Sequence, residues 1–194
     1  MSTAIPKKSS AEPRSRAMTN MSTASPQTQS NIIVDNLATA FGGRSFFTNV
    51  PVVADRAESK SRLYQSHRSE LLHQWELADA AIVGLGAPYR SSADPFSLNE
   101  ATDEYRALVA SSDIAGDILA SFFFEDGSEL PLGGAYTRNA LPLSHLRQMD
   151  RVLCIAGGSR KVRGIWSALR CGFVNCLITD SETAMGVIAL EEDG

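Results

Sequence analysis

The stretch VLCIAGGSRK, from Val152 to Lys161, decides the fold. Its first four residues form a short apolar run, and a glycine pair and two basic residues follow. Residues 162–170 continue with apolar side chains at helical spacing, so the stretch predicts a strand, a tight turn and a helix. A glycine turn in this place leaves backbone N–H groups at the positive end of the helix dipole, where anions bind. Lys161 adds a mobile positive charge, which makes the loop a candidate phosphate site.

Apolar runs and helical patterns alternate on both sides of this stretch. Strands are expected near residues 46–53, 80–86, 152–155 and 174–179, and helices near residues 26–41, 57–77, 99–111, 141–149, 159–170 and 182–190. The alternation predicts an α/β fold, with a mostly parallel sheet and helices on both of its faces. Ligands of such sheets bind at the carboxyl ends of the strands. We therefore expect the segment after Gly84, the Gly157–Lys161 loop and Thr179-Asp180 to converge.

Composition limits the classes of function. The chain has 194 residues, a net charge of −4 and no dense lysine or arginine block in the part expected to fold, which disfavours a nucleic-acid surface. No apolar run reaches the ~18 residues of a membrane span, so we expect a cytoplasmic protein without membrane contact. The 3 cysteines have no zinc-site spacing and are expected to be free thiols. His67, His73 and His145 lie on separate predicted helices, and neither a metal nor a cofactor is expected.

The first 24 residues differ from the rest of the chain. They are rich in Ser, Thr, Pro and Ala and lack apolar periodicity, which is typical of disorder. A helix is expected to begin near Ser25-Pro26, because serine caps helices and proline suits the first helical position. The predicted organisation is a disordered tail over residues 1–24 and one domain over residues 25–194.

Six short segments, taken in order, resemble a known family. They are Gln29-Ser30-Asn31, Ala78-Asp79-Ala80 with Val83-Gly84-Leu85-Gly86, Gly116-Asp117-Ile118 with Asp126-Gly127, Gly157-Gly158-Ser159-Arg160-Lys161, Gly172-Phe173-Val174-Asn175, and Leu177-Ile178-Thr179-Asp180. Their order and spacing resemble the SorC/DeoR-type sugar-binding domain, the effector domain of bacterial sugar-responsive transcription regulators. The resemblance extends from about Ser22 to Leu190.

The resemblance implies an α/β fold like that of ribose-phosphate isomerase and glucosamine-phosphate deaminase. It also implies that the domain binds a phosphorylated sugar and controls oligomerisation and operator binding. Transferred to this sequence, the resemblance pairs Lys161 with the phosphate, which the loop of Gly157, Gly158 and Ser159 cradles. It places Asp117 and Gln29 against the sugar as polar contacts, and Gly84 and Gly86 at the floor of the pocket.

The chain departs from the family pattern at its start. Regulators of this family begin with a helix-turn-helix module, and their effector domain opens with a strand, a Gly-Gly-Thr-Thr-like loop and an arginine-bearing segment. None of these is found before Ser25. We therefore expect a domain that lacks its first βα portion, makes no direct DNA contact and leaves a sheet edge open to pairing.

Three functions remain open at this stage. The first is a non-enzymatic sugar-phosphate effector domain that forms a homo-oligomer. The second is an isomerase-like or deaminase-like enzyme, for which Asp117 is the candidate general base. The third is an interaction fragment that joins full-length regulators and dampens them. Structural roles also compete with ligand roles: Asp117 can cap a helix, and Lys161 or Gln29 can be a solvated surface residue.

Overall fold

The computed structural model describes residues 2–6, 16–20, 30–48, 53–55, 58–87, 107, 109–131 and 136–193. Its strands are β1 (Ser2–Pro6), β2 (Arg16–Asn20), β3 (Arg44–Thr48), β4 (Val53–Asp55), β5 (Ala78–Val83), β6 (Gly116–Ile118), β7 (Ser121–Phe123), β8 (Tyr136–Arg138), β9 (Arg151–Ile155) and β10 (Cys176–Ile178). Its helices are α1 (Ser30–Ala40), η2 (Glu58–Lys60), α2 (Arg62–Glu76), α4 (Leu143–Leu146), η3 (Ser159–Lys161), α5 (Val162–Arg170) and α6 (Ser181–Asp193).

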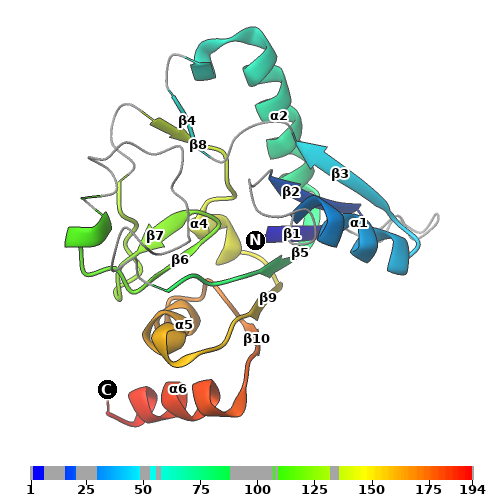
Figure 1. Cartoon of the computed structure of the whole chain (residues 1–194). Helices are drawn as coiled ribbons and strands as arrows, with labels where there is room; N and C mark the ends of the chain where they lie inside the picture. The colour runs from blue at the N-terminus through cyan, green and yellow to red at the C-terminus, as the bar shows by residue number, and fades with distance from the viewer. Residues whose placement is uncertain are drawn as a thin grey trace.

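A four-stranded sheet in the order β1-β5-β9-β10 forms the centre of the fold (Figure 1). β5, β9 and β10 run parallel, with Val83 opposite Cys154 and Ile155 opposite Ile178. β1 pairs with β5 in the antiparallel direction. The predicted α/β class and mostly parallel sheet are therefore confirmed. Ile155 and Ile178, at the carboxyl ends of β9 and β10, are each 53% exposed. No helix among the described residues covers the sheet face at these two side chains.

Strands β1 and β2 lie inside the stretch that composition predicts to be disordered. β1 pairs along β5 from Ser2 opposite Val83, and β2 pairs with β3 in parallel. Composition misses these strands because a ladder is held by backbone N–H and C=O groups, which any sequence supplies. The sequence predicts an open sheet edge without saying which strand forms it, and in the structure β1 pairs along the outer side of β5. The structure does not describe residues 7–15 or 21–29. The predicted domain boundary, between residues 24 and 25, lies in the second of these ranges.

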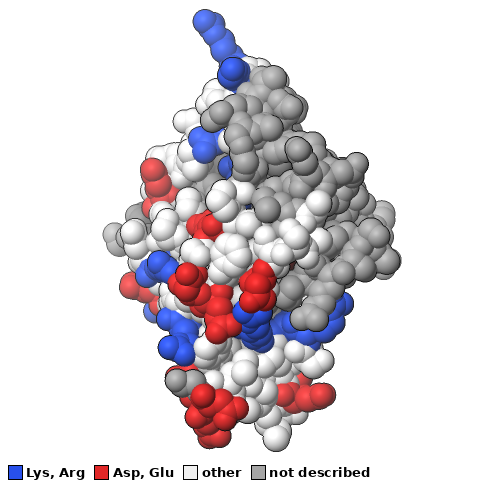
Figure 2. All heavy atoms as spheres, turned by 90° about the vertical axis from the view of Figure 1, so that its left-hand side faces the viewer, with Lys and Arg blue, Asp and Glu red and all other residues white. Residues whose placement is uncertain are grey.

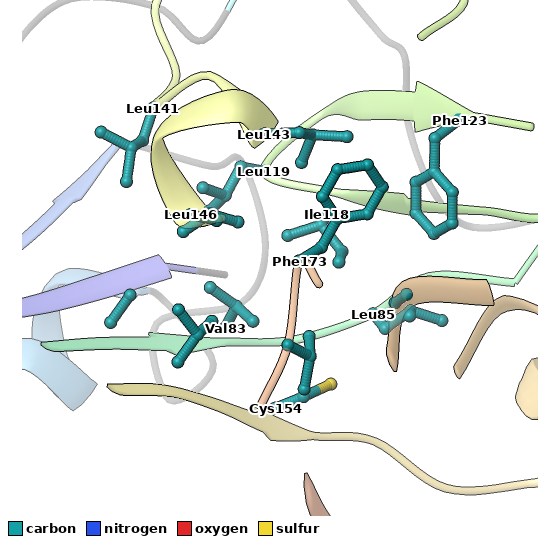
Figure 3. Close-up of a cluster of buried hydrophobic side chains, with 14 of the residues drawn as sticks. Val83, Leu85, Ile118, Leu119, Phe123, Leu141, Leu143, Leu146, Cys154 and Phe173 are labelled. Atoms are coloured by element: carbon teal, nitrogen blue, oxygen red, sulfur yellow. The ribbon is translucent and has the colours of Figure 1, made fainter. Parts of the chain in front are cut away.

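The main core lies between the sheet and the elements on its inner face. Val83 of β5 and Cys154 of β9 are 1% exposed and point toward Ile118 and Phe173 (Figure 3). The Phe173 ring meets the Phe123 ring edge-to-face, with centroids 5.4 Å apart. Apolar side chains from α2, α4 and α5 complete the cluster. Burial of these side chains is the main stabilising contribution, about 1.5–3 kcal/mol for each large one.

Two predicted elements before residue 78 are each divided in the structure. The strand expected over residues 46–53 is two strands in separate sheets: β3 pairs with β2, and β4 pairs with β8. The helix expected over residues 57–77 begins as a separate 3₁₀ turn, η2, and α2 then starts after Ser61. Ser61 fixes that start because its hydroxyl accepts a hydrogen bond from the Tyr64 N–H, at 3.2 Å.

The C-terminal unit runs β9, η3, α5, β10 and α6, as the alternation predicts. In Figure 1, α6 lies below α5. The two helices pack closely at Gly186, where an added Cβ would lie 3.0 Å from a methyl group of Val162. Because β5, β9 and β10 are parallel, the carboxyl ends of all three strands lie at the same end of the sheet. No helix in the described part is long and apolar enough to cross a bilayer.

Candidate functional site

A shallow depression of about 390 Å³ lies where β9 and β10 end. We call it the carboxyl-end depression. Seven residues line it, three from the end of β9, one from η3 and three from the end of β10: Ile155, Ala156, Gly157, Lys161, Ile178, Thr179 and Asp180. The predicted convergence of the Gly157–Lys161 loop with Thr179-Asp180 is therefore confirmed.

Lys161 supplies the positive charge of this depression. Its backbone N–H donates to the Gly158 carbonyl, at 2.9 Å, which closes the turn of η3. Its ammonium has no hydrogen bond or ion pair with any residue that the structure describes. A half-buried lysine whose ammonium makes no direct ion pair is suited to bind an anion that comes from solution.

The glycine pair has a different environment from the one predicted. The Gly158 N–H donates to Thr183 Oγ1, at 2.7 Å, and to Asp180 Oδ2, at 3.2 Å. A Cβ on Gly157 would lie 2.3 Å from Asp180 Oδ2, so the carboxylate rests directly against the Gly157 backbone. Sequence reasoning predicts free N–H groups in this turn, but side chains from the start of α6 already bind the one on Gly158.

Asp180 is held in place by α6 as well as by the loop. The N–H of Thr183 donates to Asp180 Oδ1 at 2.8 Å, so Asp180 caps the start of α6, and the Thr183 hydroxyl donates to Oδ2 at 2.8 Å. Hydrogen bonds from the backbone and side chain of Thr183, with a further one from Gly158, lower the pKa of Asp180. Asp180 is therefore a fixed negative charge at the rim of the depression.

Thr179 contributes a hydroxyl group. Its Oγ1 is buried and has no hydrogen-bond partner among the described residues. The residue lines the depression beside Gly157. A buried hydroxyl without a partner is costly unless water or a ligand satisfies it, so Thr179 is a candidate ligand contact that sequence reasoning did not select.

Asp117 and Gly86 form a second group next to the depression. The Gly86 N–H donates to the Asp117 carbonyl at 2.9 Å, and the Asp117 N–H donates to the Gly86 carbonyl at 3.3 Å. A Cβ on Gly86 would lie 1.9 Å from Asp117 Oδ1. Position 86 must therefore be glycine, because the buried carboxylate occupies the space that a side chain would take.

Burial and Lys161 act on Asp117 in opposite directions. Burial raises the pKa of Asp117 from 3.8 to about 6, while nearby positive charge, including that of Lys161, lowers it. Burial also raises the pKa of Cys154 to about 11, again opposed by Lys161. Cys154 therefore remains a neutral thiol at physiological pH. Lys161 is the group that connects the depression electrostatically to Asp117.

The remaining predicted site residues are placed as follows. Ser159 is exposed in η3, next to the depression without lining it. Gly84 follows β5 and is half-buried, and it does not line the depression either. Gln29 lies outside the described residues. The structure thus brings Gly157, Lys161 and Asp180 together, with Asp117 and Gly86 at the end of the neighbouring strand.

A surface ion cluster stands apart from the depression. Arg163 on α5 binds Asp113, at 2.6 Å, and Glu125, at 2.7 Å. On the face drawn in Figure 2, acidic and basic side chains interleave in this way, and acidic ones gather at the lower end, where α6 lies. Exposed pairs of this kind contribute about 0–1 kcal/mol each to stability. Because the guanidinium of Arg163 already binds two carboxylates, we assign this cluster no ligand role.

The sequence matches one protein family over residues 13–189, under the description "Putative sugar-binding domain". It is 28% identical over 158 residues to the sorbitol operon regulator of Klebsiella pneumoniae, covering 79% of this chain and 49% of that protein. It is 30% identical over 152 residues to the deoxyribonucleoside regulator of Bacillus subtilis, covering 78% and 48%. The chain thus spans about half the length of these curated relatives.

Solved structures show the same architecture. A transcriptional regulator from Streptococcus pneumoniae superposes with a TM-score of 0.70 at 27% identity, covering 90% of this chain and 66% of that one. The full-length sorbitol operon regulator SorC from Klebsiella pneumoniae superposes with a TM-score of 0.69 at 24% identity, covering 84% and 53%. The second likeness concerns the fold alone.

Proposed function

This chain belongs to the family of sugar-binding domains of SorC/DeoR-type transcriptional regulators, and from that premise we propose that it binds a phosphorylated sugar in the carboxyl-end depression. Lys161 binds the phosphate, Gly157 lets the ligand approach the backbone, and Thr179 and Asp117 are the polar groups available to the sugar. The domain acts as a non-catalytic effector module.

The observation that carries this proposal is the ammonium of Lys161. It lies at the carboxyl end of a parallel sheet, the position where ligands of α/β folds bind, and it has no partner among the described residues. Next to it, a buried hydroxyl on Thr179 also lacks a described partner. Both groups can be satisfied at once by a ligand that carries an anionic group and hydroxyls.

Thermal melts of the purified chain test the proposal. Ribose 5-phosphate, glucosamine 6-phosphate and inorganic phosphate are added separately to the wild type, to Lys161→Met and to the neighbouring Arg160→Met. A ligand at 100 times its Kd adds roughly 2.7 kcal/mol, which raises the midpoint by about 5–11 °C in a domain of this size. We expect a sugar phosphate to shift the wild type and Arg160→Met, but not Lys161→Met. An equal shift in Lys161→Met would remove the phosphate assignment.

Asp117 is the observation that favours an enzyme as the second candidate. A carboxylate with a pKa near 6 is suited to exchange protons at neutral pH. Its carboxylate, however, packs against Gly86 and does not line the depression. We therefore expect no turnover of ribose 5-phosphate or glucosamine 6-phosphate in an NMR assay, and detectable product that is lost in Asp117→Asn would establish the enzyme instead.

Self-association is part of the proposal. The described surface exposes Met185 to 71% and Ile188 to 58% on α6, in addition to Ile155 and Ile178. Met185 and Ile188 are three residues apart and therefore lie on one face of α6, and apolar side chains that gather into one patch are commonly covered by a partner. We expect either a homo-oligomer or a complex with a full-length regulator. Light scattering of the chain alone, and then mixed with an intact family regulator, distinguishes the two.

A further inference from the structure

The carboxylate of Asp180 lies where an anion would bind to the glycine loop. An anion that binds a Gly-Gly turn accepts hydrogen bonds from its backbone N–H groups and rests against the Cα atoms, because no side chain prevents it. Asp180 Oδ2 does both: it accepts the Gly158 N–H at 3.2 Å and touches the Gly157 backbone. The protein thus supplies its own anion to this turn.

This carboxylate is charged at neutral pH, where a phosphate is also charged. The hydrogen bonds from Thr183 and Gly158 lower its pKa below the ordinary value for aspartate. Two negative groups that share one set of donors repel each other, and the repulsion grows as they approach. A ligand phosphate therefore cannot use the Gly158 N–H while Asp180 remains on it.

Asp180 also connects the loop to the last helix. Its Oδ1 accepts the Thr183 N–H, at 2.8 Å, and Thr183 in turn accepts the Gly158 N–H through its hydroxyl, at 2.7 Å. Thr183 is 1% exposed. The first turn of α6 is thus bonded to the same N–H group that a ligand would use, and a change at the loop must change the cap of α6.

Building on the proposed function, we propose that Asp180 is an internal competitor for the ligand phosphate. In the unliganded protein its carboxylate binds the glycine loop and caps α6. A phosphate that is attracted by Lys161 displaces Oδ2 from the Gly158 N–H, and Thr183 loses its hydrogen bonds to Asp180. Ligand binding is thereby coupled to the first turn of α6, the helix that exposes Met185 and Ile188.

Isothermal titration with inorganic phosphate, followed by ribose 5-phosphate, tests the competition. The variant Asp180→Asn removes the charge and retains one carbonyl oxygen that can accept the Thr183 N–H. The matched control is Glu182→Gln, which removes an exposed charge from the same helix turn without touching the loop. We expect Asp180→Asn to bind inorganic phosphate at least tenfold more tightly than the wild type, and Glu182→Gln to remain within about twofold.

Unchanged or weaker phosphate binding in Asp180→Asn overturns the proposal. Weaker binding of ribose 5-phosphate with unchanged inorganic phosphate binding also overturns it, because Asp180 would then be a direct contact to sugar hydroxyls. Failure of the proposed function has a different result: neither anion binds the wild type or Asp180→Asn, or Lys161→Met binds as well as the wild type.

Hydrogen exchange on the wild type is a second measurement, independent of whether Asp180→Asn folds. The Thr183 amide is protected through its bond to Asp180 Oδ1. We expect saturating ribose 5-phosphate to increase the exchange of residues 181–184 and to leave the exchange of α2 unchanged. Exchange of residues 181–184 that is unaltered or slowed by the bound ligand means that Asp180 stays in place, and the proposal is then wrong.

Discussion

Asp117 is a carboxylate that the fold isolates from water. It is 6% exposed, and burial is the main cause of its raised pKa, about 6 compared with 3.8. The folded state therefore holds its proton more tightly than the unfolded chain does. Stability from this group is complete below pH 3.8 and is lost as the pH rises through about 6, because the native state must then bury a charge. The loss at neutral pH is on the order of 3 kcal/mol.

Asp117→Asn should remove this pH dependence, since an amide of the same shape does not titrate. We expect urea unfolding to show the variant gaining stability over the wild type between pH 4 and 7. The control Asp126→Asn should have the opposite sign, because hydrogen bonds from Ser128 lower the pKa of Asp126 and favour its charged form. Parallel stability curves for Asp117→Asn and the wild type would show that the carboxylate is hydrated.

Single residues of the site were predictable to different degrees. The sequence selects Lys161 and Gly157, which both line the carboxyl-end depression, because a basic residue after a glycine turn is a local pattern. The sequence predicts that the loop of Asp180 lies beside the glycine loop but not the bond of Asp180 to Gly158, because that bond joins two loops that are distant in the sequence and that β9–β10 pairing brings together. The sequence places Thr179 in a loop at the carboxyl ends of the strands but does not single out its hydroxyl, because a hydroxyl without a partner is visible only when its surroundings are known.

Helix α5 depends on a glycine at its closest contact. A Cβ on Gly164 would lie 2.7 Å from the Ala115 carbonyl oxygen, which is backbone and cannot move aside. In α6, a Cβ on Gly186 would meet only methyl groups of Val162, at 3.0 Å. The two helices thus provide a matched pair of glycines, one against rigid backbone and one against a side chain.

Gly164→Ala should destabilise the protein by about 1–3 kcal/mol, because overpacking against rigid backbone costs that much. Gly186→Ala should be neutral or stabilising, since alanine is about 1 kcal/mol better than glycine within a helix and Val162 can adjust. Chemical denaturation of both variants measures the difference. Equal losses in the two would show that α5 can shift away from the sheet.

Elements with local signals were predicted most closely. The unit from β9 to α6 was expected in the right order because glycine turns and helical periodicity mark it. The sequence predicts one strand where the structure has β3 and β4. The two strands pair with β2 and β8 in separate sheets, and this pairing depends on tertiary contacts that a local pattern does not show. β1 and β2 were missed for the same reason: their composition predicts disorder, and only the available edge of a partner strand makes them strands.

At the scale of the whole molecule, β1 is the outer strand of the central sheet and pairs with the backbone of β5. Removal of residues 2–6 should expose the backbone groups of β5 along its register with β1, and open edges pair with other chains. We expect a loss of about 2 kcal/mol, or about 4–8 °C in the melting midpoint, and larger species in size-exclusion chromatography. Deletion of residues 192–194 is the control. An unchanged midpoint and elution volume would show that β1 contributes nothing to the sheet.

The order of the strands in this sheet has a consequence for synthesis in the cell. β5 has its neighbours in β1, at the beginning of the chain, and in β9, which starts at Arg151. During synthesis, β1 therefore cannot pair until β5 has left the ribosome. The other side of β5 stays unpaired until β9 has also been made. Such distant partners slow folding and prolong the exposure of apolar strands. The nascent chain is thus a natural client for chaperones until its last two strands emerge.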